Sequence, residues 1–563
     1  MLLWSFIISK KMDPHYLSIW DYIIFGIVLG ISAAIGIYFR FTGGKQKTIQ
    51  EYLMADRQMS AIPVAFSLMA SFISAITILG VSSEVYNYGT QFLLINLAYM
   101  VGTPIVCYVY LPVFYNLKIY SVYEYLERRF GKVTRLIAST VFLLQMILYM
   151  GIVLYAPSIA LSAVTGLSKV GAILSVGIVC TFYSSLGGMK ASLLMLAAVV
   201  CVIIQGIYEF GSVSQIWEIA QNGQRIDFWQ FSIDPTHRHT FSHKLLEEHL
   251  CILAYQAQVQ RIVSTRDLQT ARLSLWYNLP IVMIISFSTG LAGLIIHAKY
   301  KDCDPILGKR IQSSDQLLPL FVVDSFKHIP GVTGLFIAGI LSGSLSTCSS
   351  AINSLAAVTF EDYIGPLLKL EKRNLKTGTV SFIIKLIALV YGVICVALAF
   401  LSEHIAGVLQ ASLTIFGIAG GPLLSIFTLG MLFPSTSEKS VIPAFLCAII
   451  VTSWIGFGRP KPVPLKLPLG KLCNVTFGNL SILSDEYSLS NSNNSWTTVE
   501  SSEPAAPLEE YFYPYRISYQ WYPLIGFTIT MVLGLILAIF IRNENPVDRT
   551  LQSPIIIKGA NVL

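Results

Sequence analysis

A chain of 563 residues that is 54% hydrophobic and only 12% charged is an integral membrane protein, because soluble proteins of this length carry about twice that share of charge. The net charge of +7 does not point to a nucleic-acid partner, since cytoplasmic loops of membrane proteins are rich in Lys and Arg. The nine cysteines form no CxxC pair and no cluster with histidine, which indicates neither a metal site nor a disulfide framework.

Long apolar runs recur along the chain and predict α-helices as the spanning elements. Basic residues cluster after the first, third, eighth and last of these runs, and before the seventh. We expect these five loops in the cytoplasm, which places the N-terminus outside and the C-terminus inside the cell. Twelve runs are clear candidates: residues 19–40, 61–85, 91–115, 134–157, 163–184, 191–210, 274–298, 331–358, 381–402, 404–433, 439–458 and 520–541.

This orientation requires one further crossing between residues 240 and 258, which makes thirteen spans in all. The sequence there supplies only an eroded span, which becomes the seventh of the thirteen in chain order. It is eroded because each charge at mid-membrane costs a few kcal/mol. The residues that interrupt it are Lys244, Glu247, Glu248 and His249.

The longest loop, residues 459–519, is polar and lies on the side that the basic clusters assign to the exterior. Its three acceptor sequons, at Asn474, Asn479 and Asn493, predict N-glycosylation. A disordered linker rich in Asn and Ser is the alternative. Cys473 in this loop and Cys303 are the two cysteines expected outside, where they can form a disulfide.

The apolar run at 331–358 carries a polar stripe. Its small and polar residues recur at spacings of three and four, so they share one face of a helix. Small hard cations accept hydroxyl and carbonyl oxygens, so the stripe predicts an ion path; close packing of two membrane helices is the alternative. The residues are Gly343, Ser346, Thr347, Ser350, Asn353 and Ser354.

A second run, Ser67–Gly80, places small and polar residues inside an apolar segment. Where such a helix unwinds, its free carbonyls can bind a cation and its half-helix ends can face a substrate. Taken alone, a kinked packing helix is the simpler interpretation. The residues are Ala70, Ser71, Ser74 and Thr77.

Six motifs make the chain resemble the sodium:solute symporter family, solute carrier family 5, over about residues 18–545. Within the family it looks most like the branch of multivitamin, monocarboxylate and iodide transporters, and less like the sugar branch. The motifs are EYLMADR (Glu51–Arg57), SVYEYLERRFG (Ser121–Gly131), LGGMK (Leu186–Lys190), QAQVQR (Gln256–Arg261), LSTCSSAIN (Leu345–Asn353) and FGIAGGPLL (Phe416–Leu424).

The resemblance implies an all-α fold of the leucine-transporter type, in which two inverted repeats of five helices follow a leading helix. The expected segments are an extracellular leader (1–18), the leading helix and inner loop (19–60), repeat one (61–210), repeat two with its degenerate span at 241–258 (211–433), helix twelve (434–458), the glycosylated loop (459–519), the last helix (520–541) and a cytoplasmic tail (542–563).

The resemblance also implies a sodium site between the broken first helix of repeat one and the third helix of repeat two. Three of its five ligands belong to the polar stripe described above. The substrate pocket of the family borders the positions of Thr77 and Asn96. The implied sodium ligands are the carbonyls of Ala70, Ile73 and Gly343 and the hydroxyls of Ser346 and Thr347.

The chain departs from the family pattern at two places. After Ala191 the family continues with a Trp-Thr-Asp segment, whose Asp helps sodium leave inward; here Ser192 follows directly. Relatives end the seventh span with Asn-Gln, where this chain has Tyr255 and Gln256. Both departures are local, which fits an alternative transcript or exon boundary; divergence to a non-transporting protein is the competing explanation.

The expected function is therefore a sodium-coupled symporter that imports a small organic anion, such as biotin or pantothenate, across the plasma membrane by alternating access. The alternatives are monocarboxylate or iodide symport, a transport-impaired isoform, and a non-transporting membrane sensor or partner subunit. The expected partners are the anionic substrate, Na⁺ and the lipid bilayer. No nucleophile–base motif, phosphate loop or metal cluster points to an enzyme.

Overall fold

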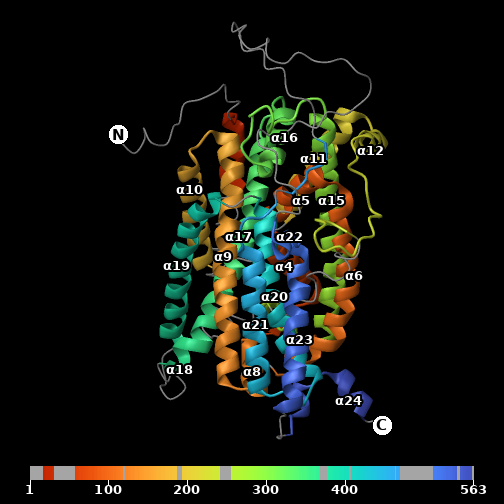
Figure 1. The fold of residues 1–563 in the computed structure, drawn as a ribbon. Helices are drawn as coiled ribbons and strands as arrows, with labels where there is room; N and C mark the ends of the chain where they lie inside the picture. The colour runs from red at the N-terminus through yellow and green to blue at the C-terminus, as the bar shows by residue number, and fades with distance from the viewer. Residues whose placement is uncertain are drawn as a thin grey trace.

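The structure, a computed structural model, describes residues 17–28, 30, 57–117, 119, 121–186, 193–240, 255–367, 377–404, 407–462, 464–468, 511–541 and 546–560. Within these ranges the regular structure is helical, and the one β-type contact is a parallel bridge between Met59 and Thr265. Figure 1 shows the helices packed side by side into one elongated bundle. The all-α fold class predicted from the apolar runs is confirmed.

The described helices, in chain order after the leading helix Ile19–Val28, are α4 (Ala61–Phe72), α5 (Ala75–Tyr88), η2 (Thr90–Leu94), α6 (Ile95–Ile105), η3 (Val106–Tyr110), α7 (Leu111–Leu117), α8 (Tyr123–Arg129), α9 (Lys132–Thr165), α10 (Lys169–Leu186), α11 (Leu193–Phe210), α12 (Val213–Asn222), α14 (Gln256–Ile262), α15 (Leu268–Tyr300), η5 (Ser314–Gln316), α16 (Leu317–Phe326), α17 (Val332–Thr359), η6 (Phe360–Ile364), α18 (Gly365–Leu367), α19 (Thr377–Leu401), η8 (Ser402–His404), α20 (Val408–Leu432), α21 (Glu438–Phe457), α22 (Tyr513–Arg516), η10 (Tyr519–Trp521), α23 (Tyr522–Phe540), η11 (Arg549–Leu551) and α24 (Pro554–Ala560).

Each of the twelve apolar runs overlaps a helix in the described part of the chain. Among the described residues, eight helices are long and apolar enough to cross a membrane, and two pairs bent by 62° and 82° bring the number to ten. The remaining two runs correspond to the shorter apolar helices Ile19–Val28 and Lys169–Thr181. Most of the thirteenth span, expected within 241–258, lies outside the described residues, and α14 begins at its end.

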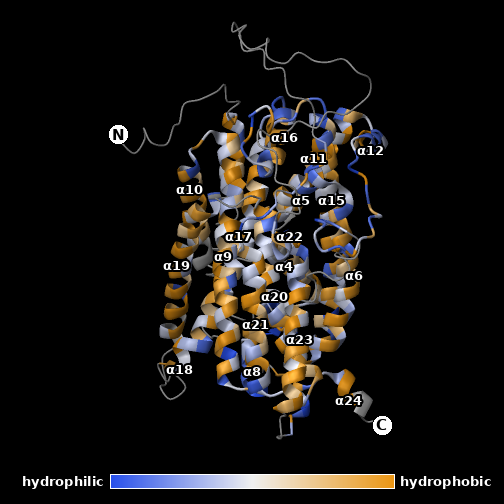
Figure 2. Cartoon of the chain, in the orientation of Figure 1, coloured by the Kyte–Doolittle hydropathy of each residue, from blue (hydrophilic) through white to orange (hydrophobic). Residues whose placement is uncertain are grey.

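The helix with the polar stripe lies at the centre of the bundle. In the span Val332–Leu367, which contains α17, the most apolar stretch of 18 residues is 94% buried. The corresponding stretches of α19 and of Tyr519–Phe540, which contains α23, are each 28% buried. Figure 2 shows orange, apolar residues dominating α19 and α23, in keeping with their exposed sides. A polar helix face therefore lies where protein, and not lipid, surrounds it.

The helical run that begins at Ala61 breaks in its middle. Ile73 and Ser74 both have extended backbone conformations, which separates α4 from α5. The Ser74 hydroxyl then caps the new helix by accepting the N–H of Ile76 at 3.1 Å. The break falls inside the Ser67–Gly80 segment, for which the sequence left an unwound helix and a kinked packing helix as alternatives.

The bundle has two distinct ends. The upper end in Figure 1 carries α12 and α16, and the lower end carries α8 and α18.

Cys303, which follows α15, is disulfide-bonded, while the other six described cysteines are free thiols. Its expected partner, Cys473, lies outside the described residues.

Candidate functional site

The candidate ion site lies where the end of α4 meets the middle of α17. Because α4 ends at Phe72, the carbonyl of Ala70 lacks the amide that a continuous helix would offer it. The hydroxyl of Thr347 on α17 lies 3.4 Å from that carbonyl and 3.2 Å from the carbonyl of Gly343. The geometry thus gathers three oxygens from two helices.

The remaining two predicted ligands belong to the same two elements. Ser346 is 1% exposed, and its hydroxyl has no hydrogen-bond partner in the described part of the chain. A buried hydroxyl without a partner costs free energy unless a ligand satisfies it. Ile73 stands at the break itself and lines a cavity together with Thr347.

The oxygens at this junction are carbonyl and hydroxyl groups. Among the described residues, no group of three or more His, Cys, Asp or Glu could hold a metal ion. Neutral oxygens suit a monovalent hard cation better than Ca²⁺ or Mg²⁺, which are usually bound through carboxylates. An added Cβ at Gly343 would lie 2.5 Å from the sulfur of Met195, so the Met195 side chain would have to move.

A cavity of about 120 Å³ opens beside the junction, between the helix break and α6, α9, α14, α15 and α20. Thr77, named from the sequence, lines it. Its walls combine aromatic rings with scattered hydroxyl groups, a composition typical of a pocket for a small organic molecule. The hydroxyl-bearing residues other than tyrosine are Ser71, Ser74, Thr77, Ser286, Thr347, Ser350 and Ser412.

Asn96 lies one layer behind the cavity wall. Its side-chain amide donates to the carbonyl of Leu93 at 2.7 Å and to the hydroxyl of Ser286 at 3.0 Å. Ser286 lines the cavity, whereas Asn96 does not. The structure therefore places Asn96 where it orients a wall residue.

The sequence did not single out the aromatic wall of the cavity. The ring of Phe416 lies 4.5 Å from that of Tyr149 and 4.9 Å from that of Tyr255, measured between centroids. Gln145 donates to the Tyr255 hydroxyl at 3.1 Å and so fixes the ring. Tyr255 was visible only as a departure from the family pattern, and aromatic residues in apolar runs carry no signal of their own.

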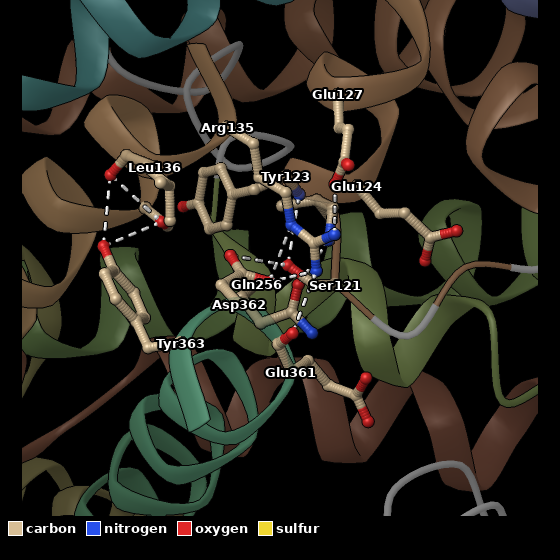
Figure 3. A network of polar contacts seen from close by, with 12 residues as sticks. Ser121, Tyr123, Glu124, Glu127, Arg135, Leu136, Gln256, Glu361, Asp362 and Tyr363 are labelled. Atoms are coloured by element: carbon tan, nitrogen blue, oxygen red, sulfur yellow. Dashed lines mark hydrogen bonds and ion pairs between the residues drawn. The ribbon is translucent and has the colours of Figure 1, made fainter. Parts of the chain in front are cut away.

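A polar network closes the lower end of the bundle, and Figure 3 shows its residues converging from α8, α9, α14 and η6. Arg135 donates to Asp362 from Nε at 3.0 Å and to Glu127 at 2.6 Å. The hydroxyl of Ser121 lies 3.4 Å from the other Asp362 oxygen. These contacts tie the ends of α9 and α17 to the segment that precedes α8.

The short helix α14 is attached to this network and to the ion junction. The side-chain oxygen of Gln256 accepts the N–H of Val122 at 2.8 Å. Arg261, at the other end of α14, donates to the carbonyl of Ser67 at 2.8 Å and also contacts the hydroxyl of Ser350. The helix α14 therefore joins the lower polar network to the helices that form the ion junction.

A second network closes the upper end. The carboxylate of Glu84 on α5 accepts hydrogen bonds from Nε and a terminal nitrogen of Arg238, at 2.7 and 3.1 Å. It accepts another from a ring nitrogen of His239 at 2.7 Å. Arg238 also donates to Gln410 on α20 at 2.9 Å. Burial alone would lower the pKa of Arg238, but the Glu84 carboxylate outweighs it and raises that pKa above its usual range.

The sequence pattern that defines the sodium:solute symporter family matches residues 52–447. The chain belongs to this family. It is 51% identical, over 93% of its length and 86% of the relative's, to a Drosophila melanogaster protein that carries the name of a sodium-dependent multivitamin transporter. It is 39% identical to human sodium-coupled monocarboxylate transporter 1, over 92% of this chain and 87% of that one.

A solved structure shares the fold of this symporter. It is the substrate-bound, outward-open state of a Na⁺-coupled sialic acid symporter, with a TM-score of 0.75, 22% identity, and coverage of 94% of this chain and 99% of that one. At this identity the likeness establishes the leucine-transporter-type fold alone. Family membership makes the chain a multi-pass membrane transporter that couples the movement of a small solute to sodium.

Proposed function

We propose that the chain imports a small organic anion of the vitamin-carboxylate type, such as biotin or pantothenate, together with sodium across the plasma membrane. The 51% identity to a chain named as a multivitamin transporter supports this class of substrate. Monocarboxylate symport is the second candidate, favoured by the 39% identity to a monocarboxylate transporter. Lipid and solute are the expected partners.

The proposed sodium site consists of the carbonyls of Ala70, Ile73 and Gly343 and the hydroxyls of Ser346 and Thr347. The observation that carries it is the convergence of the Thr347 hydroxyl with the carbonyls of Gly343 and of Ala70 at the broken end of α4. The Ser346 hydroxyl, buried on the same helix, has no partner among the described residues. A cation would satisfy that hydroxyl and the freed carbonyl of Ala70 together.

Transport would proceed by alternating access, with the upper network facing outside and the lower network facing the cytoplasm. Basic side chains of α8 and α9, among them Arg128, Arg129 and Arg135, gather at the lower end and support this orientation. The disulfide of Cys303 at the other end supports it as well, because disulfides persist in oxidising surroundings. The N-terminus would then lie outside and the C-terminus inside.

The remaining assignments follow the same orientation. The two repeats at 61–210 and 211–433 would form the transport core, and the loop 459–519 would lie outside. The sequons at Asn474, Asn479 and Asn493 in that loop lie outside the described residues, so their glycosylation stays a prediction.

The energy of coupling bears on stoichiometry. One sodium ion that crosses 100 mV gains about 2.3 kcal/mol, and a tenfold sodium gradient adds about 1.4 kcal/mol. A monovalent anion that travels with one sodium moves no net charge and loses the voltage contribution. Efficient import of such an anion therefore favours two sodium ions for each anion.

Uptake of labelled biotin, pantothenate, lactate and iodide into cells that express the chain tests the proposal. We expect uptake of a vitamin carboxylate that depends on external sodium. Uptake of lactate alone would select the monocarboxylate candidate. No sodium-dependent uptake of any of the four, with the protein present at the surface, would contradict transport by this chain.

Thr77→Val should weaken substrate binding without changing the sodium site. Valine keeps the shape of threonine but removes the hydroxyl from the cavity wall, so we expect the KM for the anion to rise roughly threefold to tenfold. The sodium concentration for half-maximal uptake at saturating anion should stay unchanged. Thr289→Val is the matched control, because the Thr289 hydroxyl bonds to its own helix at Ile285, away from the cavity.

A further inference from the structure

The segment between α12 and the upper network, residues 224–240, lies against the outside of the bundle. Figure 1 shows it descending from α12 along α15. The carbonyl of Arg225 accepts the N–H of Thr90 at 2.8 Å, and the Thr90 hydroxyl accepts the N–H of Asp227 at 3.0 Å. Gln91 donates to the carbonyl of Gln230 at 3.2 Å. The start of the α6 span thus fixes the backbone of this segment.

Three large apolar side chains project from the segment into the surroundings. Trp229, Phe231 and Ile233 are 73%, 64% and 81% exposed. They alternate with polar residues in a stretch that has no regular secondary structure. The rings of Trp229 and Phe231 stack with centroids 6.1 Å apart. A surface that faces water rarely presents such a cluster of large apolar side chains.

The segment that carries the cluster runs beside helices of the bundle whose exposed faces are apolar (Figure 1). α6 exposes Met100 and Val101, and α15 exposes Ile284 and Phe287, on helices that qualify as membrane spans. The segment with the cluster is bonded to η2, which begins the span Thr90–Leu117. The two ends of a membrane span lie at the level of the lipid headgroups. Tryptophan and other aromatic residues concentrate at this level of membrane proteins.

We propose that Trp229, Phe231 and Ile233 insert into the headgroup region of the leaflet at the upper end of the bundle, so that the partner of this surface is the phospholipid bilayer. The polar residues between them would face the protein and water. The inserted cluster would hold the outer part of the segment at a fixed depth, while its far end carries Arg238 and His239 to the upper network.

Spin labels on single introduced cysteines in full-length protein, reconstituted in phosphatidylcholine nanodiscs, test the proposal. Labels at 229, 231 and 233 should be accessible to oxygen and protected from a water-soluble nickel chelate. Labels at 234 and at the exposed His237 should show the reverse, and a label at Ile284 gives the lipid reference. The unsubstituted protein, treated in the same way, measures labelling of native cysteines.

Equal access of the nickel chelate at 231, 233 and 237 would overturn the proposal, since the cluster would then stand in water. Protection from both reagents would also overturn it, because a second copy of the chain or the bundle itself would then cover the cluster. A label-free check compares the unsubstituted protein with Trp229→Phe. Brominated lipid should quench the part of the tryptophan emission that this substitution removes, and an unquenched difference would contradict insertion.

Discussion

Thr347→Ala is expected to raise the sodium concentration for half-maximal uptake by roughly ten- to a hundredfold. The substitution removes one hydroxyl oxygen from the junction of α4 and α17, where it lies within 3.4 Å of two carbonyls. A hydrogen-bonding group that contacts a charge contributes about 1.5–3 kcal/mol, and about 1.4 kcal/mol corresponds to a tenfold change in affinity. The measurement is uptake as a function of external sodium at saturating anion.

Ser344→Ala is the control for this experiment. Its hydroxyl is also buried on α17 without a partner, but Ser344 is not among the proposed ligands. A sodium dependence that Thr347→Ala leaves unchanged would mean that the polar stripe is only a packing face.

Ser346→Ala separates ion binding from transport. Because the Ser346 hydroxyl makes no hydrogen bond in the described chain, its removal should not lower the melting temperature of sodium-free protein. Sodium stabilises the folded state by binding to it, so the rise in melting temperature on sodium addition should shrink or vanish. A full sodium-induced rise in this variant would remove Ser346 from the site, whatever the uptake shows.

Glu84→Gln is expected to open the upper end of the cavity. The substitution leaves the buried guanidinium of Arg238 without its carboxylate, and breaking one side of a buried ion pair costs about 3–5 kcal/mol. Since the pair joins the segment at 238 to α5, and Arg238 also holds α20 through Gln410, this cost falls on the closed state. A loss of about 3 kcal/mol corresponds to roughly a hundredfold shift between closed and open states.

A cysteine at Ser412, in the cavity wall on α20, reports this opening. Its reaction with an impermeant thiol reagent should be much faster in the Glu84→Gln background, and uptake should fall. Glu403→Gln is the matched control, because the Lys169–Glu403 pair is exposed and contributes little. Unchanged reactivity at position 412 in Glu84→Gln would mean that the upper network does not gate the cavity.

The sequence predicted those features that depend on neighbouring residues. The alternation of apolar runs with basic loops located each described spanning helix, because a bilayer requires long apolar helices. The stripe on α17 followed from helical spacing. Small and polar residues around Ser74 marked the segment where α4 and α5 separate, although a kinked helix was the simpler interpretation of those residues alone. Conversely, the sequence could not show whether Asn96 lines the cavity or lies behind its wall. A difference of one turn along a helix is enough to decide whether a side chain faces the cavity or supports a residue that does.

The contacts between distant segments could not be read from the chain. Glu84 and Arg238 are 154 residues apart, and Arg135 and Asp362 are 227 residues apart. Their charges, taken singly, look like loop or helix-end charges, and only packing puts them together. The aromatic wall of Tyr149, Tyr255 and Phe416 likewise draws on three different elements.

The sequence by itself thus determined the class of protein, the spanning helices and the two halves of the candidate ion site. Those properties are local, because hydropathy and helical period act over one or two turns. The family resemblance already implied that the two halves meet at a helix break. Only the tertiary structure decided that a small cavity adjoins them and that polar networks lie at both ends of the bundle. Such contacts depend on how the helices cross, and no short stretch of sequence encodes a crossing.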